Sequence, residues 1–213
     1  MKILVTGFDP FGGESINPAI EVVKELDEEI LGATIIKLEI PTVCYKSLQV
    51  IEEAIKRYDP DVILSIGQAG GRSDITVERI GININDFSIR DNEGQQIIDE
   101  KIYEDGPDAY FVNIPIKAVV EKIRLSKIPA SVSNTAGTFV CNHVIYGVRH
   151  LIETKYNGKK SGFIHIPYLP EQVIEKKGVS SMSLDVIVQG ITEAIKAIIE
   201  NEIDIKTIGG AIH

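Results

Sequence analysis

Residues 2–13, KILVTGFDPFGG, join an apolar run to a glycine-rich loop. The run Lys2–Thr6 contains apolar and β-branched residues and stops at a glycine, which is typical of a buried strand that meets a turn. Asn17 and Pro18 then provide a helix cap followed by proline at the first helical position, and apolar residues recur at helical spacing as far as about Leu31. This stretch therefore predicts a strand, a loop and a helix.

The same alternation continues along the chain. Runs typical of strands lie at Ala33–Ile40, Asp61–Ile66, Ala130–Ser133 and Ser161–Ile166. Helical spacing of apolar residues occurs at Ser47–Arg57, Ile114–Leu125, Thr138–Tyr156 and Leu184–Ile199. Strands that alternate with helices predict an α/β fold with a parallel or mixed sheet covered on both faces.

Residues 75–87 follow a different pattern, in which apolar and polar residues alternate. The isoleucines share one parity, at Ile80, Ile82 and Ile84. We predict an antiparallel excursion here. Glu78 has the same parity, and a carboxylate on an apolar face needs a partner. The alternatives are that Arg72 or Arg79 pairs with it, or that the strand starts later and Glu78 is solvated.

Composition limits the class of protein. The chain has 213 residues, of which 44% are hydrophobic and 25% charged, and we expect one domain over residues 1–213 with a loose tail from about residue 203. The 22 Lys and Arg against 31 Asp and Glu give a net charge of −9, opposite to the balance of a nucleic-acid binder. No apolar run is long enough for a membrane span or a signal-peptide core, so we expect a cytoplasmic protein that binds neither membrane nor nucleic acid.

The first two glycine-rich loops are candidates for ligand contact. The loop GFDPFGG (7–13) lacks the Lys-Ser/Thr of a phosphate-binding loop and the spacing of a dinucleotide fingerprint. Phe8 and Phe11 follow a strand's carboxyl end, where α/β sheets bind ligands, so they either line an apolar pocket or anchor the loop on the core. The loop GQAGGR (67–72) either directs N–H groups at a substrate oxygen or forms only a tight turn.

Two cysteines are too few for a disulfide scaffold, which raises the question of a reactive thiol. Cys141 falls in the first turn of a predicted helix, where free N–H groups and the helix dipole favour a thiolate. The alternative is a small buried hydrophobe, since free cysteine is often buried. Cys44 has no such setting, and we interpret it as structural.

A cysteine nucleophile needs a base, and the chain has four histidines. His143 and His150 belong to the same predicted helix as Cys141 but lie on another face or too far along it, and His213 is the terminal residue. His165 ends a predicted central strand and is our candidate base. Glu78 is the candidate acid that orients the imidazole. No His, Cys or acidic residues have the spacing of metal ligands, so we expect no metal.

The chain resembles the type I pyroglutamyl peptidases, also called pyrrolidone-carboxylate peptidases. The resemblance is carried by these motifs: TGFDPFGG (6–13), Asn17-Pro18, GQAGGR (67–72), Glu78-Arg79, DNEG (91–94), SNTAGTFVCN (133–142) and GFIHIPYLPEQ (162–172). As a set, these motifs are far more specific than any one glycine-rich loop.

This resemblance implies a three-layer α/β/α sandwich with a mixed, mostly parallel sheet. It implies a cytoplasmic cysteine peptidase, without a cofactor, that removes an N-terminal 5-oxoproline residue from peptides and forms a homotetramer. The triad of the family falls on Cys141, His165 and Glu78, the residues already singled out. The pyroglutamyl pocket falls on Phe8, Phe11, Asn17, Thr42, Gln68, Ile89, Phe139 and Val140.

One segment departs from the family pattern. Where the family usually reads Asp-Ala-Arg-Ile-Pro-Asp-Asn, residues 86–92 read DFSIRDN. Ser88 replaces an arginine and Arg90 replaces the proline. We hypothesise that Arg90 partly compensates for the lost positive charge.

Two rival functions remain open at this point. Similar α/β/α architectures host nucleoside phosphorylases, although no phosphate site is legible in this sequence. A lactam- or peptide-binding protein without turnover is the second rival. Ser88 favours that binding function, and the complete set Cys141, Glu78 and His165 argues against it.

Overall fold

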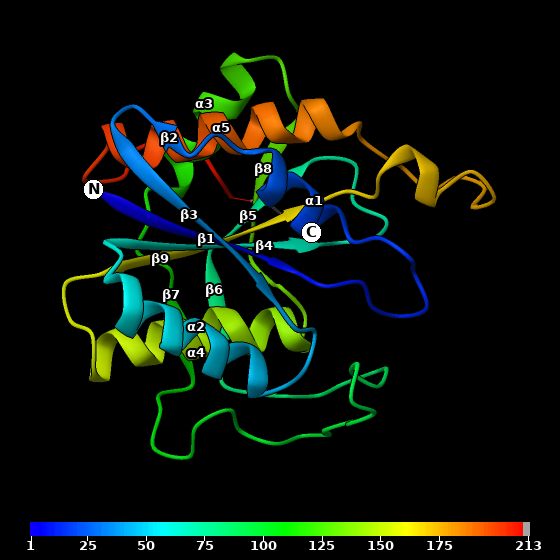
Figure 1. Cartoon of the computed structure of the whole chain (residues 1–213), viewed down its shortest axis with the longest axis vertical. Helices are drawn as coiled ribbons and strands as arrows, with labels where there is room; N and C mark the ends of the chain where they lie inside the picture. The colour runs from blue at the N-terminus through cyan, green and yellow to red at the C-terminus, as the bar shows by residue number, and fades with distance from the viewer. Residues whose placement is uncertain (211–213) are drawn as a thin grey trace.

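The computed structural model describes residues 1–210 and has a central sheet of seven strands between two layers of helices (Figure 1). The strands are β1 (Lys2–Phe8), β2 (Glu29–Ile30), β3 (Ala33–Ile40), β4 (Val62–Gln68), β5 (Ile75–Glu78), β6 (Ile80–Ile82), β7 (Ala109–Phe111), β8 (Ala130–Ser133) and β9 (Lys160–Ile166). The helices are α1 (Pro18–Glu25), α2 (Lys46–Tyr58), α3 (Ile116–Leu125), α4 (Val140–Thr154), the short 3₁₀ helix η1 (Pro170–Gln172) and α5 (Leu184–Glu200).

The strand order in the sheet is β2-β3-β1-β4-β9-β5-β8. β1 pairs in parallel with β3 and β4, β4 with β9, and β5 with β8, whereas β2 runs antiparallel to β3 and β5 antiparallel to β9. The predicted α/β class and the mixed, mostly parallel sheet are confirmed. Four parallel strands with their carboxyl ends together bring four connecting loops to one edge, where α/β proteins bind ligands.

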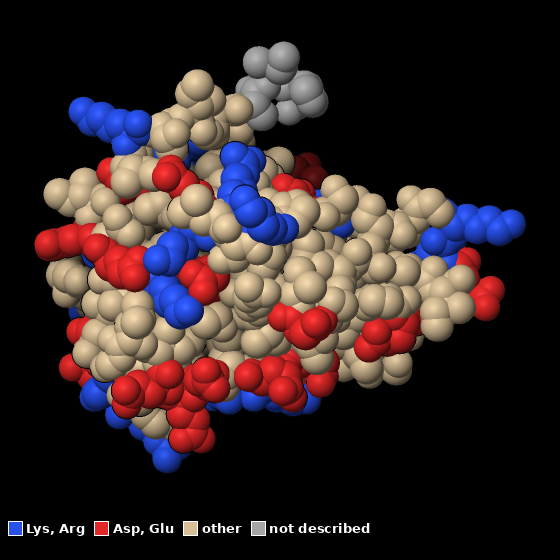
Figure 2. Space-filling view, turned by 90° about the horizontal axis from the view of Figure 1, so that it is seen from above, with Lys and Arg blue, Asp and Glu red and all other residues tan. Residues whose placement is uncertain are grey.

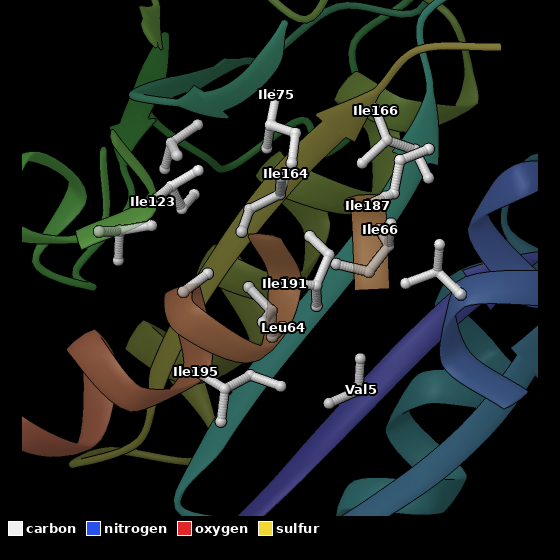
Figure 3. Close-up of a cluster of buried hydrophobic side chains, with 14 of the residues drawn as sticks. Val5, Leu64, Ile66, Ile75, Ile123, Ile164, Ile166, Ile187, Ile191 and Ile195 are labelled. Carbon is white, nitrogen blue, oxygen red and sulfur yellow. The ribbon is translucent and has the colours of Figure 1, made fainter. Parts of the chain in front are cut away.

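Each face of the sheet has its own apolar core. On one face, α1, α3 and α5 cover a cluster rich in isoleucine, which includes Leu64, Ile164 and Ile191 (Figure 3). On the other face, α2 and α4 cover a cluster that includes Leu4, Ile63 and Phe163. Central strands buried on both faces read as continuous apolar runs, which is why their positions were legible in the sequence.

The first helix is shorter than predicted. It ends at Glu25 rather than near Leu31, because Leu26 adopts an extended conformation. The chain then turns through Gly32, which has a positive φ of 77°, so that the two-residue strand β2 pairs with the start of β3. The apolar residues after Leu26 therefore belong to a strand and a turn and not to the apolar face of a helix.

The antiparallel pairing predicted for residues 75–87 is confirmed, because β5 pairs antiparallel with β9 and β6 with β7, but the segment is not one continuous strand. β5 belongs to the main sheet, whereas β6 leaves it and pairs antiparallel with β7. Gly81 packs against Ile145 and Tyr146 of α4. After β5, the alternating positions that are buried are the polar ones, Asn83 and Asn85. The residues at Ile80, Ile82 and Ile84 are only half-buried. The parity that singled out Glu78 is therefore not the reason for its burial.

Residues 203–210 have no helix or strand but are attached to the body. The Asp204 carboxylate accepts hydrogen bonds from the N–H groups of Lys117 and Ala118 at the start of α3. The Arg79 guanidinium donates to the carbonyl of Gly209. The tail predicted to be loose thus has defined contacts over residues 204–209, and the terminal His213 lies outside the described residues.

On the surface shown in Figure 2, basic side chains are interspersed with acidic ones. Among residues 1–210, no helix combines the length and the apolar character that crossing a membrane requires.

Candidate active site

The three candidate catalytic residues come from three elements that meet near the carboxyl edge of the sheet. Cys141 is the second residue of α4, His165 lies in β9 and Glu78 is the last residue of β5. β5 and β9 are adjacent strands, in which Thr76 is the register partner of His165. The pairing of β5 with β9 thus brings together Glu78 and His165, which are 87 positions apart in the sequence.

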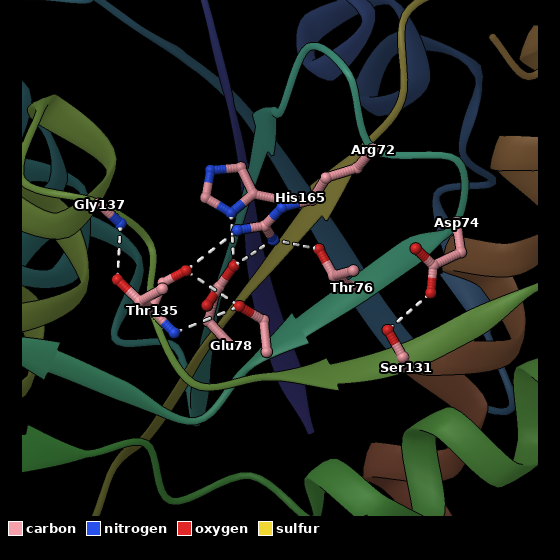
Figure 4. Close-up of polar contacts among 9 residues, drawn as sticks. Arg72, Asp74, Thr76, Glu78, Ser131, Thr135, Gly137 and His165 are labelled. Carbon is pink, nitrogen blue, oxygen red and sulfur yellow. Dashed lines mark hydrogen bonds and ion pairs between the residues drawn. The ribbon is translucent and has the colours of Figure 1, made fainter. Parts of the chain in front are cut away.

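His165 and Glu78 form a buried pair (Figure 4). Nδ1 of His165 lies 2.7 Å from Oε1 of Glu78, and the two side chains are 4% and 0% exposed. A carboxylate can only accept, so we assign the ring proton to Nδ1, which leaves Nε2 with a free lone pair. This tautomer is the one that a general base requires.

The environment favours an ionised Glu78 and a neutral His165. Burial alone would raise the pKa of Glu78, but His165 first, and then the nearby polar groups of Ser133 and Arg72, outweigh it and hold this pKa below its ordinary value. Burial lowers the pKa of His165 against the opposing effect of Glu78, and Arg72 lowers it further. A neutral imidazole on an ionised carboxylate is ready to accept a proton at Nε2.

Gly67 makes room for the thiol of Cys141. It is the register partner of His165 across β4 and β9. A Cβ atom at Gly67 would lie 3.2 Å from Cys141 Sγ and 2.7 Å from the ring of Phe163. The sulfur therefore lies against the sheet at Gly67, the residue of β4 that is paired with His165. No hydrogen bond joins Cys141 to His165 in the described part of the chain, and in free enzymes such contacts are often long before substrate binds.

Gly67→Ala is expected to lower kcat by about tenfold or more, because displacing a nucleophile by about 1 Å can cost a factor of 100. The added methyl group must also displace Phe163, so we expect a loss of roughly 1–3 kcal/mol in the free energy of unfolding. Steady-state kinetics and thermal unfolding measure both effects. Gly209→Ala is the control, because a Cβ atom there meets only ordinary contacts at 3.4 Å or more. Unchanged kcat in Gly67→Ala would contradict this account of the glycine.

The expectation that the helix N-terminus makes Cys141 a thiolate is not met. Burial, and after it the charge of Glu78, raise the pKa of this thiol to about 12, against the opposing charge of Arg72. The low-dielectric surroundings and the nearby carboxylate outweigh the helix dipole, whose effect is short-ranged. The raised pKa favours the thiol form of Cys141, so a nucleophilic role would require a base to accept its proton.

Three of the predicted pocket residues line one cleft. Phe11, Gln68 and Ile89 surround it together with Gly12, Glu14, Gly70 and Tyr168. The ring of Phe139 lies 6.2 Å from that of Phe11, centroid to centroid. These four side chains come from the loop after β1, the end of β4, the loop before β7 and the N-cap of α4, so sequence separation hides their proximity.

The other four lie beneath the surface and support the loops. Asn17 and Thr42 both donate hydrogen bonds to the carbonyl of Asp9, which fixes the loop that carries Phe11. Phe8 is 2% exposed and packs on Phe163, and Val140 is fully buried in the α2–α4 core. The structure thus divides the predicted set into side chains that line the cleft and side chains that hold it.

Arg72 is the cation next to the acid. Its Nη1 lies 2.6 Å from Glu78 Oε1, so the pairing that the sequence left as an alternative to a triad coexists with the His165 contact. Arg90, which we hypothesised to compensate for Ser88, instead donates to the carbonyl of Gly94 in the following turn. Its position in the sequence was no guide to the direction of its side chain.

The remaining histidine–cysteine contact lies in the core. The sulfur of Cys44 is 3.5 Å from Nδ1 of His143, and Nε2 of this ring accepts from the N–H of Tyr45. Burial lowers the pKa of His143 to about 3 and raises that of Cys44 to about 12, so both are neutral. Sequence reasoning missed this contact, which joins residues 99 positions apart. Within residues 1–210, no group of three or more His, Cys, Asp or Glu side chains could hold a metal ion.

A family model described as Pyroglutamyl peptidase matches residues 1–201. The chain belongs to the pyroglutamyl peptidase family. The family and the enzyme class predicted from the motifs are confirmed. Curated members of the family with similar sequences include the pyrrolidone-carboxylate peptidases of Fusobacterium nucleatum, 66% identical over 99% of both chains, and of Finegoldia magna, 61% identical over the full length of both.

Solved structures of the pyroglutamyl peptidase family have the same fold. The crystal structure of pyroglutamyl peptidase I from Bacillus amyloliquefaciens is 50% identical and superposes with a TM-score of 0.94, covering 97% of this chain and 98% of that one. A mutant pyrrolidone carboxyl peptidase from Pyrococcus furiosus is 43% identical with a TM-score of 0.90, covering 94% and 99%. The three-layer α/β/α sandwich is therefore confirmed by the sheet, its two helical layers and these neighbours.

Proposed function

We propose that this protein hydrolyses the bond between an N-terminal 5-oxoproline residue and the rest of a peptide, with Cys141 as nucleophile, His165 as general base and Glu78 as orienting acid. The observation that carries the proposal is the buried His165–Glu78 pair, with 2.7 Å between Nδ1 and Oε1. The neighbouring strand β4 carries Gly67, and the Cys141 sulfur lies against this glycine. Family membership over residues 1–201 supports the choice of substrate.

In the first half of the reaction, Nε2 of His165 takes the thiol proton as Sγ attacks the carbonyl carbon of 5-oxoproline. Glu78 stabilises the imidazolium that forms. Candidate donors to the resulting oxyanion are backbone N–H groups near Gln68 and Cys141. The start of α4 supports this assignment, because its N-cap Phe139 provides no side-chain acceptor for the free N–H groups.

In the second half, Nε2 gives its proton to the leaving amine as the carbon–nitrogen bond breaks, and a thioester with Cys141 remains. His165 then removes a proton from water, which attacks the thioester. Collapse of this intermediate breaks the carbon–sulfur bond, returns the proton to sulfur and releases 5-oxoproline. A neutral His165 is needed twice, first to accept the proton of the thiol and then to accept a proton from water.

The proposed pocket for the lactam is lined by Phe11, Gln68 and Ile89, with Phe139 next to Phe11, and is supported from beneath by Phe8, Asn17, Thr42 and Val140. A flat, neutral lactam suits an apolar wall such as the neighbouring rings of Phe11 and Phe139, whose centroids are 6.2 Å apart. A few polar groups suffice to distinguish it from proline, which lacks the ring carbonyl. Gln68 supplies an amide at the cleft, where its Oε1 already accepts a hydrogen bond from Gln172.

The deciding measurement is release of a fluorogenic amine from its 5-oxoprolyl amide, with the prolyl amide as control. We expect turnover of the first substrate and none of the second. Absence of turnover by the folded protein, together with measurable binding of a pyroglutamyl peptide, would favour the rival binding function. In that case the first explanation to test for the lack of turnover is the altered segment at Ser88.

The family resemblance also supports two proposals about context, a homotetramer and a cytoplasmic location. Analytical ultracentrifugation of the purified protein tests the first. A sedimenting species of one chain's mass would overturn it.

A further inference from the structure

Arg72 contacts three residues in two segments around the candidate site, Thr76 and Glu78 of β5 and Thr135 after β8 (Figure 4). It lies on the loop between β4 and β5. Its Nη1 donates to Glu78 Oε1 at 2.6 Å and also to Thr76 Oγ1, and its Nη2 donates to the carbonyl of Thr135 at 3.0 Å. The arginine side chain is 29% exposed, whereas that of Glu78 is fully buried. A guanidinium is suited to this task, because its donors have a fixed fork geometry.

Arg72 and His165 share one carboxylate oxygen. Oε1 of Glu78 accepts from Nη1 of Arg72 at 2.6 Å and from Nδ1 of His165 at 2.7 Å. The second oxygen, Oε2, is buried and has no hydrogen-bond partner in the described chain. The position of Oε1, and hence the orientation of the imidazole, therefore depends on the guanidinium.

The second branch of Arg72 reaches the segment that carries the nucleophile. Thr135 belongs to the connection between β8 and α4, in which Ser133 Oγ also donates to the Thr135 carbonyl. This connection ends at Phe139, the N-cap of α4, two residues before Cys141. One side chain thus bridges the acid–base pair and the loop that leads to the thiol.

We infer that Arg72 is a positioning residue, whose guanidinium holds the Glu78–His165 pair in register with the loop that places Cys141. The inference rests on the reaction proposed above. Among residues 1–210, the charged and titratable groups that act on Cys141 and His165 are Glu78 from β5 and Arg72 itself. The positive charge of Arg72 lowers the pKa of both Cys141 and His165.

The test compares Arg72→Met and Arg72→Lys with the wild type on the 5-oxoprolyl amide. In Arg72→Met we expect kcat to fall roughly 10- to 100-fold, the size typical for groups that orient a functional side chain, with KM little changed. Both limbs of the pH profile of kcat/KM are expected to move to higher pH, because loss of a positive charge raises the pKa of both the base and the thiol. Arg72→Lys keeps the positive charge but not the forked arrangement of donors. We therefore expect the two limbs of its pH profile to lie close to those of the wild type, while kcat recovers only in part.

Arg79→Met is the matched control. Arg79 also holds the β8–α4 connection, through Nε to Asn134 Oδ1 at 2.8 Å, and it donates to the Gly209 carbonyl, but within residues 1–210 its guanidinium makes no hydrogen bond or ion pair with the Glu78 carboxylate. We expect wild-type kcat and unchanged pH limbs. Equal effects in Arg79→Met and Arg72→Met would overturn the inference, since tethering of the loop would then explain both.

Wild-type kcat and pH limbs in Arg72→Met would also overturn it. Thermal unfolding identifies a variant that does not fold. In that case Arg72→Lys decides: reduced kcat with wild-type limbs supports the inference, and wild-type kcat refutes it. Failure of the proposed function is distinguishable, because the wild type itself would then release no amine.

Discussion

Cys141→Ser is expected to reduce kcat for the 5-oxoprolyl amide by about 10³- to 10⁶-fold, the range seen when a catalytic nucleophile is lost. A hydroxyl is a weaker acid than a thiol and a poorer nucleophile, so His165 must remove its proton at a much higher cost. The substitution replaces one atom, and we expect the melting temperature to change little. Steady-state and burst kinetics, with circular dichroism of the folded variant, measure the effect.

Cys44→Ser is the matched control for this substitution. Cys44 is 2% exposed and lies against His143, away from the candidate triad. We expect wild-type kcat per folded molecule and a loss of about 1–3 kcal/mol in the free energy of unfolding, because a hydroxyl is buried in place of a thiol. The assignment of the nucleophile would be wrong if Cys44→Ser abolished turnover and Cys141→Ser did not.

Glu78→Gln is expected to lower kcat by about 10²- to 10⁴-fold with a smaller effect on KM. An amide carries no negative charge to stabilise the imidazolium, and its NH₂ group can favour the wrong tautomer of the ring; in a serine triad the equivalent change costs about 10⁴. The Arg72 guanidinium also loses its ion partner, so we expect destabilisation of roughly 3 kcal/mol or less, given its partial exposure. Kinetics and thermal unfolding on the same samples separate the two effects.

Glu21→Gln controls for the loss of an ion pair as such. Glu21 pairs with Lys24 on α1, and the two side chains are 34% and 55% exposed. Surface pairs contribute about 0–1 kcal/mol, so kcat and stability should both remain near wild type. Near-wild-type kcat in Glu78→Gln would remove Glu78 from the proposed triad.

Local sequence was sufficient for much of this molecule. The buried strands β1, β4 and β9 read as continuous apolar runs because both of their faces are covered. Helix α4 was legible from its apolar spacing, which put Cys141 in its first turn. The position of His165 at the end of a central strand followed from the same reasoning.

Glu78 shows that a local pattern can single out a residue for a reason that differs from its tertiary surroundings. Its parity with Ile80, Ile82 and Ile84 suggested one continuous strand, but the chain leaves the main sheet after Glu78. Burial of the carboxylate instead comes from its neighbours in space, His165 and Arg72. Long-range packing determines which strands pair, and a local alternation of apolar and polar residues carries no information about it.

The sequence by itself determined the strand–helix alternation, the family, and the three residues of the candidate triad, because periodicity and motif spacing are local properties of the chain. Only the tertiary structure decided that Arg72 and His165 share one oxygen of Glu78, that Gly67 makes room for the sulfur, and that burial raises the pKa of the Cys141 thiol. Hydrogen-bond distances and desolvation depend on which segments meet in space, and these segments are far apart along the chain.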